Sequence, residues 1–292
     1  MAIDSVAVVP VLVLRGFYLA ASVLILVLQC IPILRSRFLA YGSRASATPN
    51  EKAKTKKKNK NKNKNKTPAT ALEQLLDYAA SLQVPHNYFT HFYVVSVASS
   101  LFWAWRKELW GAGGKVQTAW LLMLLQGVRR LAESSVYTSS SKSSMWFAHW
   151  ILGCLFYQVT NVAVWVELQP GELLAWKAVV LVPAVLTAHY LQHSYHAYLY
   201  RLRTQNTGYQ LPSHPLFPNL LCPHYTCEVA IYALLSLLAA PQGRVVNWTL
   251  MSATIFVLVN LGVTAAGTKE WYAEKFGQSR VSGRKRMIPW VW

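Results

Sequence analysis

The sequence is poor in acidic residues and in cysteine, and it lacks the common nucleotide-binding motifs. Its 292 residues include 11 Asp and Glu against 29 Lys and Arg, which gives a formal net charge of +18. Four scattered cysteines without a CxxC or Cys/His spacing argue against a disulfide framework and against a zinc module. The sequence contains no GxGxxG or P-loop motif, so we expect any nucleotide to be held by another kind of fold. The first residues, Met1–Asp4, carry an acid and no base, which disfavours a cleavable signal peptide.

Positive charge is concentrated in one segment, and the remainder of the chain is strongly apolar. Residues 51–66 contain nine lysines and one glutamate, and therefore contribute +8 of the +18. Hydrophobic residues still make up 53% of the chain, and the mean hydropathy is +0.23. This combination disfavours a soluble enzyme and a disordered chain, and it predicts an all-α integral membrane protein with a basic insert. Because the insert lacks aromatic side chains, we interpret it as a loop attracted to anionic headgroups and expect no nucleic-acid partner.

Seven apolar runs approach the length of about 20 residues that a spanning helix needs. Lys and Arg are most frequent after the first, third, fifth and seventh runs, which predicts a lumenal N-terminus and a cytosolic C-terminus. We expect three parts: a first span (1–34), a basic cytosolic loop (35–83) and a six-span domain (84–292). The seven runs are residues 6–34, 86–105, 117–137, 145–166, 174–198, 223–240 and 246–266.

Ionisable residues interrupt several of these runs, and such residues inside a membrane commonly have a function. Arg15 interrupts the first run, and we expect it to have a structural or snorkelling role. His91 and Tyr93 stand near the start of the second run, close to its predicted cytosolic end. They are candidates for a site, and the alternative is an interfacial aromatic belt.

The third run carries four polar residues on one helix face. Gln126, Arg129, Arg130 and Glu133 lie at positions i, i+3, i+4 and i+7, so their side chains point the same way. This face predicts part of a site near the cytosol. The alternative is an internal Arg130–Glu133 pair with the arginines as positive-inside anchors.

The fifth run carries three histidines at helical spacing. His189, His193 and His196 lie at i, i+4 and i+7, and Gln192 and His196 are also four residues apart. Membrane di-iron enzymes use such spacings, but they need several histidine boxes with adjacent His-His pairs, and this chain has no His-His pair. We therefore predict a polar face that lines a ligand groove and no metal site.

Two further polar segments lie towards the C-terminus. Pro223 suits the first position of a helix, and His224 and Glu228 follow it four residues apart. Glu228 lies in an otherwise apolar run and needs a polar partner there. Residues 268–292 are too polar to span a membrane, and their basic stretch could contact phosphates.

The order of these motifs resembles the steroid 5-alpha-reductase family. The chain reads HFY, then QGVRRL, QHSYH with YRLR, GYQLP, PHYTCE, and finally WYAEKF with RKRMIPWVW. The PHYTCE and HFYVVSV segments are more similar to the polyprenol and polyprenal reductase branch than to the steroid branch. The resemblance runs from about residue 84 to 292 and is most specific in the last 70 residues.

The resemblance implies a seven-span enzyme of the endoplasmic reticulum membrane that uses NADPH. One departure concerns the steroid-type members, which carry a tyrosine that helps to polarise the steroid carbonyl. The corresponding residue here is Gly127, so the steroid acid site is not reproduced. The residues that match cofactor-binding motifs of the family are Gln192, His196, Arg203, Tyr209, His224, Glu228, Tyr272, Arg284 and Lys285.

The implied reaction is reduction of the α-isoprene double bond of polyprenal or polyprenol, in the dolichol pathway that supports protein N-glycosylation. Hydride adds readily only to a conjugated double bond, so we favour the aldehyde as direct substrate. His91, Tyr93 and Glu133 are our candidates for stabilising the oxyanion and for proton transfer. We expect a monomer whose partners are a long-chain isoprenoid and the bilayer.

Three alternatives stay open at this stage. A 3-oxo-4-ene steroid is the main rival substrate within the same family. Isoprenylcysteine-type methyltransferases have a broadly similar C-terminal half, although their RHPxY motif is absent and this chain reads CPHYTCE. A non-catalytic scaffold would leave the polar faces of the fifth and sixth runs unexplained.

Overall fold

The structure is a computed structural model of the chain. It describes residues 5–39, 70–137, 143–168, 173–206 and 208–292, so the lysine-rich segment lies outside the described residues.

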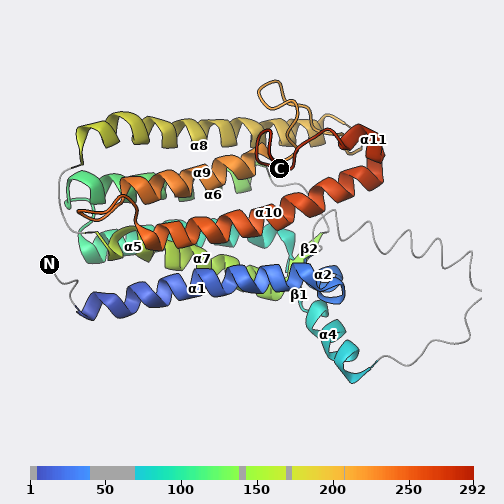
Figure 1. The fold of residues 1–292 in the computed structure, drawn as a ribbon, viewed down its shortest axis with the longest axis horizontal. Helices are drawn as coiled ribbons and strands as arrows, with labels where there is room; N and C mark the ends of the chain where they lie inside the picture. Colours follow the sequence, from blue (N-terminus) through green and yellow to red (C-terminus); the bar gives the residue numbers. More distant parts are fainter. Residues whose placement is uncertain (1–4, 40–69, 138–142, 169–172, 207) are drawn as a thin grey trace, which may run out of the picture.

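Within the described residues, each of the seven predicted apolar runs coincides with a long helix (Figure 1). The helices begin and end within several residues of the predicted limits, and α8 and α10 continue well beyond their apolar runs. Pro223 occupies the start of its helix, as predicted. The seven helices are α1 (Ser5–Cys30), α5 (Phe89–Lys107), α6 (Gly114–Val136), α7 (Phe147–Val166), α8 (Ala175–Thr204), α9 (Pro223–Leu238) and α10 (Trp248–Phe276).

Three of these helices are long and apolar enough to cross a membrane by length and composition, namely α1, α7 and α10. The prediction of a helical membrane protein is therefore confirmed. Helix α9 has only 16 residues, and α6 and α8 carry arginines and other polar side chains along one face. The count of seven spans and the sides on which the termini lie stay predictions.

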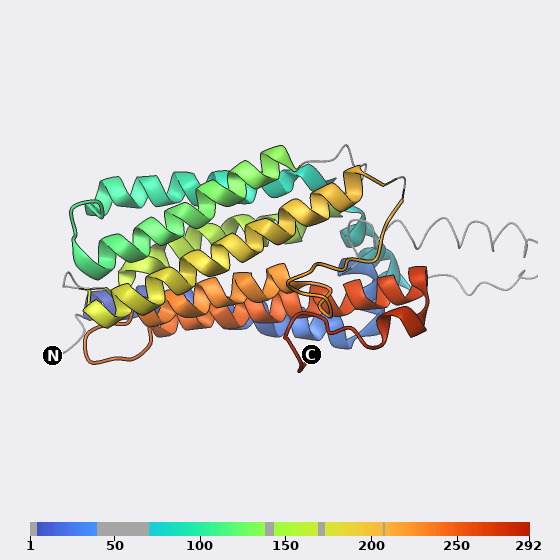
Figure 2. The ribbon, with the colours of Figure 1, turned by 90° about the horizontal axis from the view of Figure 1, so that it is seen from above.

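The long helices form two groups that run side by side (Figures 1 and 2). In one group, α5 packs against both α6 and α7. In the other, α9 packs between α8 and α10, and α1 lies along α10. The two groups touch through α7, which contacts α1 and α10, and through α6, which contacts α8 and α9. This division leaves room for a cavity between the groups.

Short elements cover the end of the bundle where α1 finishes (Figure 1). Helix α2 (Pro32–Phe38) follows α1, and a capping box formed by Thr70 and Glu73 begins α4 (Ala71–Ser81). The antiparallel strands β1 (Gln83–Pro85) and β2 (Ser144–Trp146) then tie the entries of α5 and α7 together. The remaining short elements are the 3-10 helix η1 (His86–Tyr88) and α11 (Gln278–Val281).

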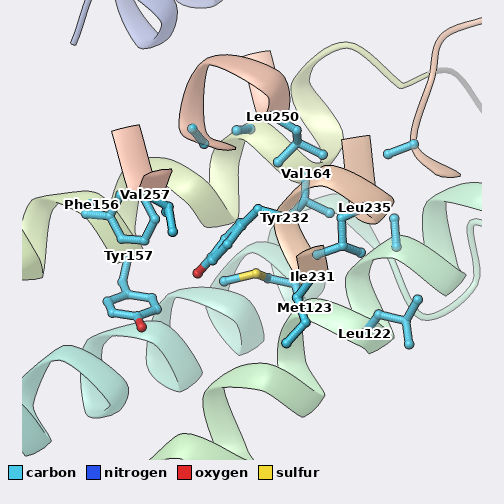
Figure 3. Packing of buried hydrophobic residues seen from close by; sticks show 14 of the residues in the cluster. Leu122, Met123, Phe156, Tyr157, Val164, Ile231, Tyr232, Leu235, Leu250 and Val257 are labelled. Carbon is cyan, nitrogen blue, oxygen red and sulfur yellow. The ribbon is translucent and has the colours of Figure 1, made fainter. Parts of the chain in front are cut away.

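Aromatic and aliphatic side chains fill the core between α7, α9 and α10 (Figure 3). Phe156 contacts the ring of Tyr232 edge to face at 5.7 Å between centroids and stacks on Phe256 at 5.1 Å. Tyr232 is completely buried. The core thus fixes the spacing of the three helices on which part of the site is built.

Close packing of α5 against α6 depends on small residues. Ser96, Ser99 and Ser100 of α5 are buried, and a Cβ atom added to Gly127 of α6 would lie 2.8 Å from Ser96 Oγ. Small residues let membrane helices approach closely. A side chain at position 127 would therefore have to displace the side chain of Ser96 or move α5.

The structural role expected for Arg15 is confirmed. Its Nη2 donates to Glu167 Oε2 at 2.9 Å, and its Nε donates to Thr249 Oγ1 at 3.1 Å. Glu167 follows the last residue of α7, and Thr249 lies in the first turn of α10. Arg15 therefore links α1, α7 and α10 at one end of the bundle.

Candidate active site

A cavity of about 620 Å³ lies between the two helix groups. Residues from α5, α6, α7, α8, α9 and α10 line it, together with residues of the loop after α8. Its lining is mostly polar on α6, α8 and α9. On α5, α7 and α10 it is mostly aromatic or aliphatic, with the polar residues Thr90, His149, Asn260 and Thr268 among them. A volume of this size is typical of a small-molecule site.

Glu133 is the centre of the polar wall. Its side chain is 3% exposed, and its oxygens lie 2.6 Å from Arg129 Nη1 and 2.5 Å from Arg130 Nη1. The Nδ1 atoms of His193 and His196, one turn apart on α8, lie 2.9 and 2.8 Å from the same carboxylate. The predicted Arg130–Glu133 pair is therefore confirmed. Two guanidinium groups beside the histidines also make this wall electrostatically poor for a metal cation.

A second network holds Glu228 of α9. Gln126 Nε2 donates to both carboxylate oxygens, at 2.8 and 2.9 Å, and Gln192 Nε2 donates to one of them. The amide oxygens of both glutamines accept from Arg129 Nη2. Glu228 thus has the polar partners that its place in an apolar helix requires. Arg129 connects the two carboxylates through direct and amide-mediated contacts.

Tyr93 of α5 lies beside Arg130 on the same cavity wall. Arg130 Nη2 donates to the Tyr93 hydroxyl at 2.5 Å, and the guanidinium carbon lies 4.7 Å from the ring centroid. Tyr157 of α7 also lines the cavity, and its ring contacts that of Tyr93 edge to face at 5.5 Å. Two buried phenols and one arginine therefore stand together where the polar and apolar walls meet.

His224 of α9 lies next to this group. Its ring stacks on Tyr195 at 5.2 Å with an interplanar angle of 13°, and it meets the ring of His196 edge to face at 5.2 Å. Its Nδ1 atom is buried and has no hydrogen-bond partner in the described part of the chain. Such an atom in a cavity wall is a position for a polar ligand group.

The loop after α8 reaches the cavity through Tyr209 and is fastened by the C-terminal tail. Tyr209 of this loop lines the cavity with Arg203, the last arginine of α8. The Arg284 guanidinium donates to the carbonyl oxygen of Pro212, and the Tyr198 hydroxyl accepts from the backbone of Ser213 at 2.8 Å. The loop is therefore bonded both to the C-terminal tail, through Arg284, and to α8, through Tyr198.

The backbone of Lys285 also binds the loop, because its N–H donates to Asn219 O at 2.8 Å and its carbonyl accepts from Leu221 N at 3.0 Å. Tyr272 packs in a small cluster with Leu221 and Val281. In the same loop, burial beside Arg201 lowers the pKa of the His214 imidazole below its ordinary value.

The structure brings most of the predicted site residues to one cavity. Tyr93 and Glu133 line it, whereas His91 is exposed and packs against Tyr88 and Trp150, with ring centroids 4.4 and 6.0 Å away. The predicted cofactor residues that line the cavity are Gln192, His196, Arg203, Tyr209, His224 and Glu228. Tyr272, Arg284 and Lys285 are not among its lining residues.

Sequence reasoning placed Arg130 on the polar face of the third run but gave it no separate role, and it did not single out Tyr157. The spacing of Arg130 gave a usable signal, since it shares a helix face with Glu133. Tyr157 gave no signal, because an aromatic residue inside an apolar run is typical of a core.

Comparisons with known proteins show which family the chain belongs to. The family described as 3-oxo-5-alpha-steroid 4-dehydrogenase matches residues 141–292, just over half of the chain. The chain is 25% identical over 274 residues to the polyprenal reductase of Saccharomyces cerevisiae, covering 91% of this chain and 89% of that protein. It is 26% identical over 247 residues to the polyprenal reductase of Danio rerio (70% and 78% covered). It is 27% identical over 267 residues to polyprenal reductase 1 of Arabidopsis thaliana (72% and 82% covered). The chain therefore belongs to the 3-oxo-5-alpha-steroid 4-dehydrogenase family, the steroid 5-alpha-reductases.

Proposed function

We propose that this protein reduces the α-isoprene carbon–carbon double bond of polyprenal with NADPH as hydride donor. The observation that carries the proposal is the Tyr93 hydroxyl, which accepts from Arg130 at 2.5 Å in the wall of a cavity with one polar and one apolar side. Similarity to polyprenal reductases from three organisms supports the substrate class.

The chemistry of hydride addition favours the aldehyde over the alcohol as direct substrate. In an enal, the β-carbon can receive a hydride because the negative charge is delocalised onto the aldehyde oxygen. An allylic alcohol offers no such group. The site must therefore stabilise an oxyanion on the aldehyde oxygen and deliver one proton to the α-carbon.

Tyr93 suits the task of donating to that oxygen. A phenol has one proton and accepts through its lone pairs. Because Arg130 donates to the hydroxyl, a lone pair is occupied and the Tyr93 proton is left for an acceptor in the cavity. The nearby guanidinium also favours negative charge on a bound oxyanion. Tyr93 is thus our proposed donor to the substrate oxygen.

Glu133 acts in this proposal as a positioning residue. Its oxygens already face two arginines and two histidines, so they are poorly placed to exchange a proton with a substrate. Its contact with Arg130 instead fixes the guanidinium that holds Tyr93. His91 stays a predicted catalytic residue, and it is not among the residues that line the cavity.

The polar wall fits the nicotinamide end of NADPH, which would supply the hydride. Buried His224 Nδ1 needs a partner, and the carboxylate of Glu228 has capacity for a further donor beyond the two glutamine amides. We propose that these two residues, with Gln192 and His196, hold that end. Arg203 and Tyr209 would hold the phosphate and adenosine side, and Tyr272, Arg284 and Lys285 are proposed to support that side through the loop and tail.

The cellular setting follows from the same proposal. We propose seven spans with a lumenal N-terminus and a cytosolic C-terminus, in the endoplasmic reticulum membrane. Residues 84–292 would form the reductase domain, after a first span (1–34) and a basic loop (35–83). The protein would act as a monomer on a long-chain isoprenoid, in the dolichol pathway that supports N-glycosylation.

Substitution of Tyr93 by Phe tests the assignment without removing the ring. We expect kcat for polyprenal to fall roughly 10²–10³-fold, the effect of losing one oxyanion donor, with NADPH binding unchanged. Tyr157→Phe is the matched control, because Tyr157 lines the same cavity. A kcat within threefold of wild type in Tyr93→Phe, or a large loss only in Tyr157→Phe, would contradict the role of Tyr93.

The rival steroid activity is supported by the description of the matching family. A 4-ene-3-keto steroid is also a conjugated carbonyl compound, so the same chemistry applies to it. However, the position of the steroid-type tyrosine is Gly127 here, and even a Cβ atom added there would lie 2.8 Å from Ser96 Oγ. We therefore propose polyprenal as the substrate, and reduction of the steroid alone would favour the rival.

A further inference from the structure

Gly153 of α7 lies directly against the ring of Phe92 on α5. A Cβ atom added at Gly153 would lie 2.5, 2.6 and 2.8 Å from three carbons of that ring. Ordinary carbon–carbon contacts need about 3.5–4.0 Å, so the ring would have to move by about 1 Å. Both residues line the cavity. Gly153 therefore determines how close to α7 the Phe92 ring can lie.

The surroundings of Phe92 limit where its ring could move. The ring is 4% exposed, and it meets the ring of Phe89 edge to face at 4.8 Å. The α7 backbone lies on the Gly153 side, and the neighbouring residue Tyr93 is the proposed donor to the substrate oxygen. A ring displaced from α7 would enter the space of the cavity. The width of the cavity beside Tyr93 thus depends on the missing side chain at position 153.

The residues of α7 and α10 that line the cavity are largely apolar, with His149, Asn260 and Thr268 as polar members. Besides Phe92 and Gly153, its walls include Leu152 and Phe156 from α7 and Leu261 from α10. An isoprene unit carries a methyl branch and is wider than an unbranched alkyl chain. A wall opened by a glycine matches a branched chain better than a wall filled by a side chain.

We propose that Gly153, by letting Phe92 lie flat against α7, sets the width that admits a methyl-branched isoprenoid chain. Gly153 and Phe92 are then specificity-determining residues, and neither supplies chemistry. The inference rests on the proposed function, because it concerns the chain attached to the reacting enal.

The test compares Gly153→Ala with wild type on two conjugated aldehydes, polyprenal and an unbranched long-chain 2-alkenal. We expect KM for polyprenal to rise roughly tenfold or more, the usual effect of a misfit of one methyl group, and KM for the unbranched aldehyde to change less than twofold. Phe92→Leu in the Gly153→Ala background should restore polyprenal reduction, because the smaller side chain makes room again.

Two glycine variants serve as matched controls. Gly16→Ala adds a Cβ that meets nothing within 4 Å, and Gly127→Ala adds one that clashes with Ser96 away from the cavity lining. Neither should change the preference for the branched aldehyde. Equal changes for both aldehydes in Gly153→Ala, or the same branch-selective change in Gly127→Ala, would overturn the inference.

Binding of a fluorescent polyprenol keeps the inference separate from the proposed function. If wild type reduces neither aldehyde, the proposed function fails. The inference still predicts at least tenfold weaker polyprenol binding by Gly153→Ala, with recovery in the Phe92→Leu background. Unchanged binding in that variant would refute it.

Discussion

Neutralising Glu133 should destabilise the protein more than neutralising any exposed glutamate. In Glu133→Gln, the amide keeps the size of the side chain but removes the charge that faces two arginines. Its NH₂ group would also point at donors. Removing one partner of a buried ion pair costs about 3–5 kcal/mol.

The structure places the expected loss near the lower limit of that range. The side chains of Arg129 and Arg130 are 13% and 19% exposed, so water can solvate them in part. Arg129 also keeps its bonds to Gln126 and Gln192, and Arg130 keeps its bond to Tyr93. We therefore expect a loss of about 3 kcal/mol in the free energy of unfolding. On the scaling for domains of 150–250 residues this corresponds to a Tm roughly 6–12 °C lower.

The assay is thermal unfolding of purified protein in one detergent, followed by intrinsic tryptophan fluorescence. Glu270→Gln is the matched control, because Glu270 pairs with Arg35 and the two side chains are 52% and 37% exposed. Such an exposed pair contributes about 0–1 kcal/mol. A decrease in Tm for Glu133→Gln no larger than that for Glu270→Gln would refute the view that Glu133 organises the polar wall.

Three further predictions concern other parts of the chain. Glu228→Gln should abolish NADPH binding while the protein stays folded in the membrane, since its new NH₂ group would meet the glutamine donors; normal NADPH affinity in a titration would contradict this. Arg15→Met should lower the Tm, and the double variant with Glu167→Gln should be more stable than the single one, because no unpaired carboxylate remains; equal values would argue against the pair. Deleting residues 51–66 should leave turnover nearly unchanged in detergent, and a collapse in folded protein would show that the lysines are more than a passive loop.

The helices could be predicted from the sequence because the length and apolar composition of a run nearly determine whether it forms a long helix. The shared face of Gln126 and Glu133 was accessible for the same reason, since helical periodicity fixes which side chains point together. The residues on other helices that contact this face could not be predicted. The histidines that meet Glu133 come from a helix about 60 residues later, and only the packing of α8 against α6 decides which of them reach it.

The apolar side of the site was even harder to predict from the sequence. A glycine such as Gly153 can occur inside an apolar run for many reasons, so the sequence alone does not show its role. Its contact with Phe92 depends on the distance between α5 and α7. His91 was predicted with Tyr93 because both stand near the start of the second apolar run. Two residues of separation put them on different faces of the helix, so only Tyr93 reaches the cavity.

The central claim is that this protein reduces the conjugated double bond of polyprenal. The most direct test is NADPH-dependent turnover by purified protein in detergent, with polyprenal, polyprenol and a 4-ene-3-keto steroid offered side by side. We predict that polyprenal alone gains two hydrogens at its α-isoprene unit, as identified by mass spectrometry of the product. Reduction of the steroid but not of polyprenal would contradict the substrate. No reduction of any of the three, by protein that binds S-adenosylmethionine, would contradict the reaction itself.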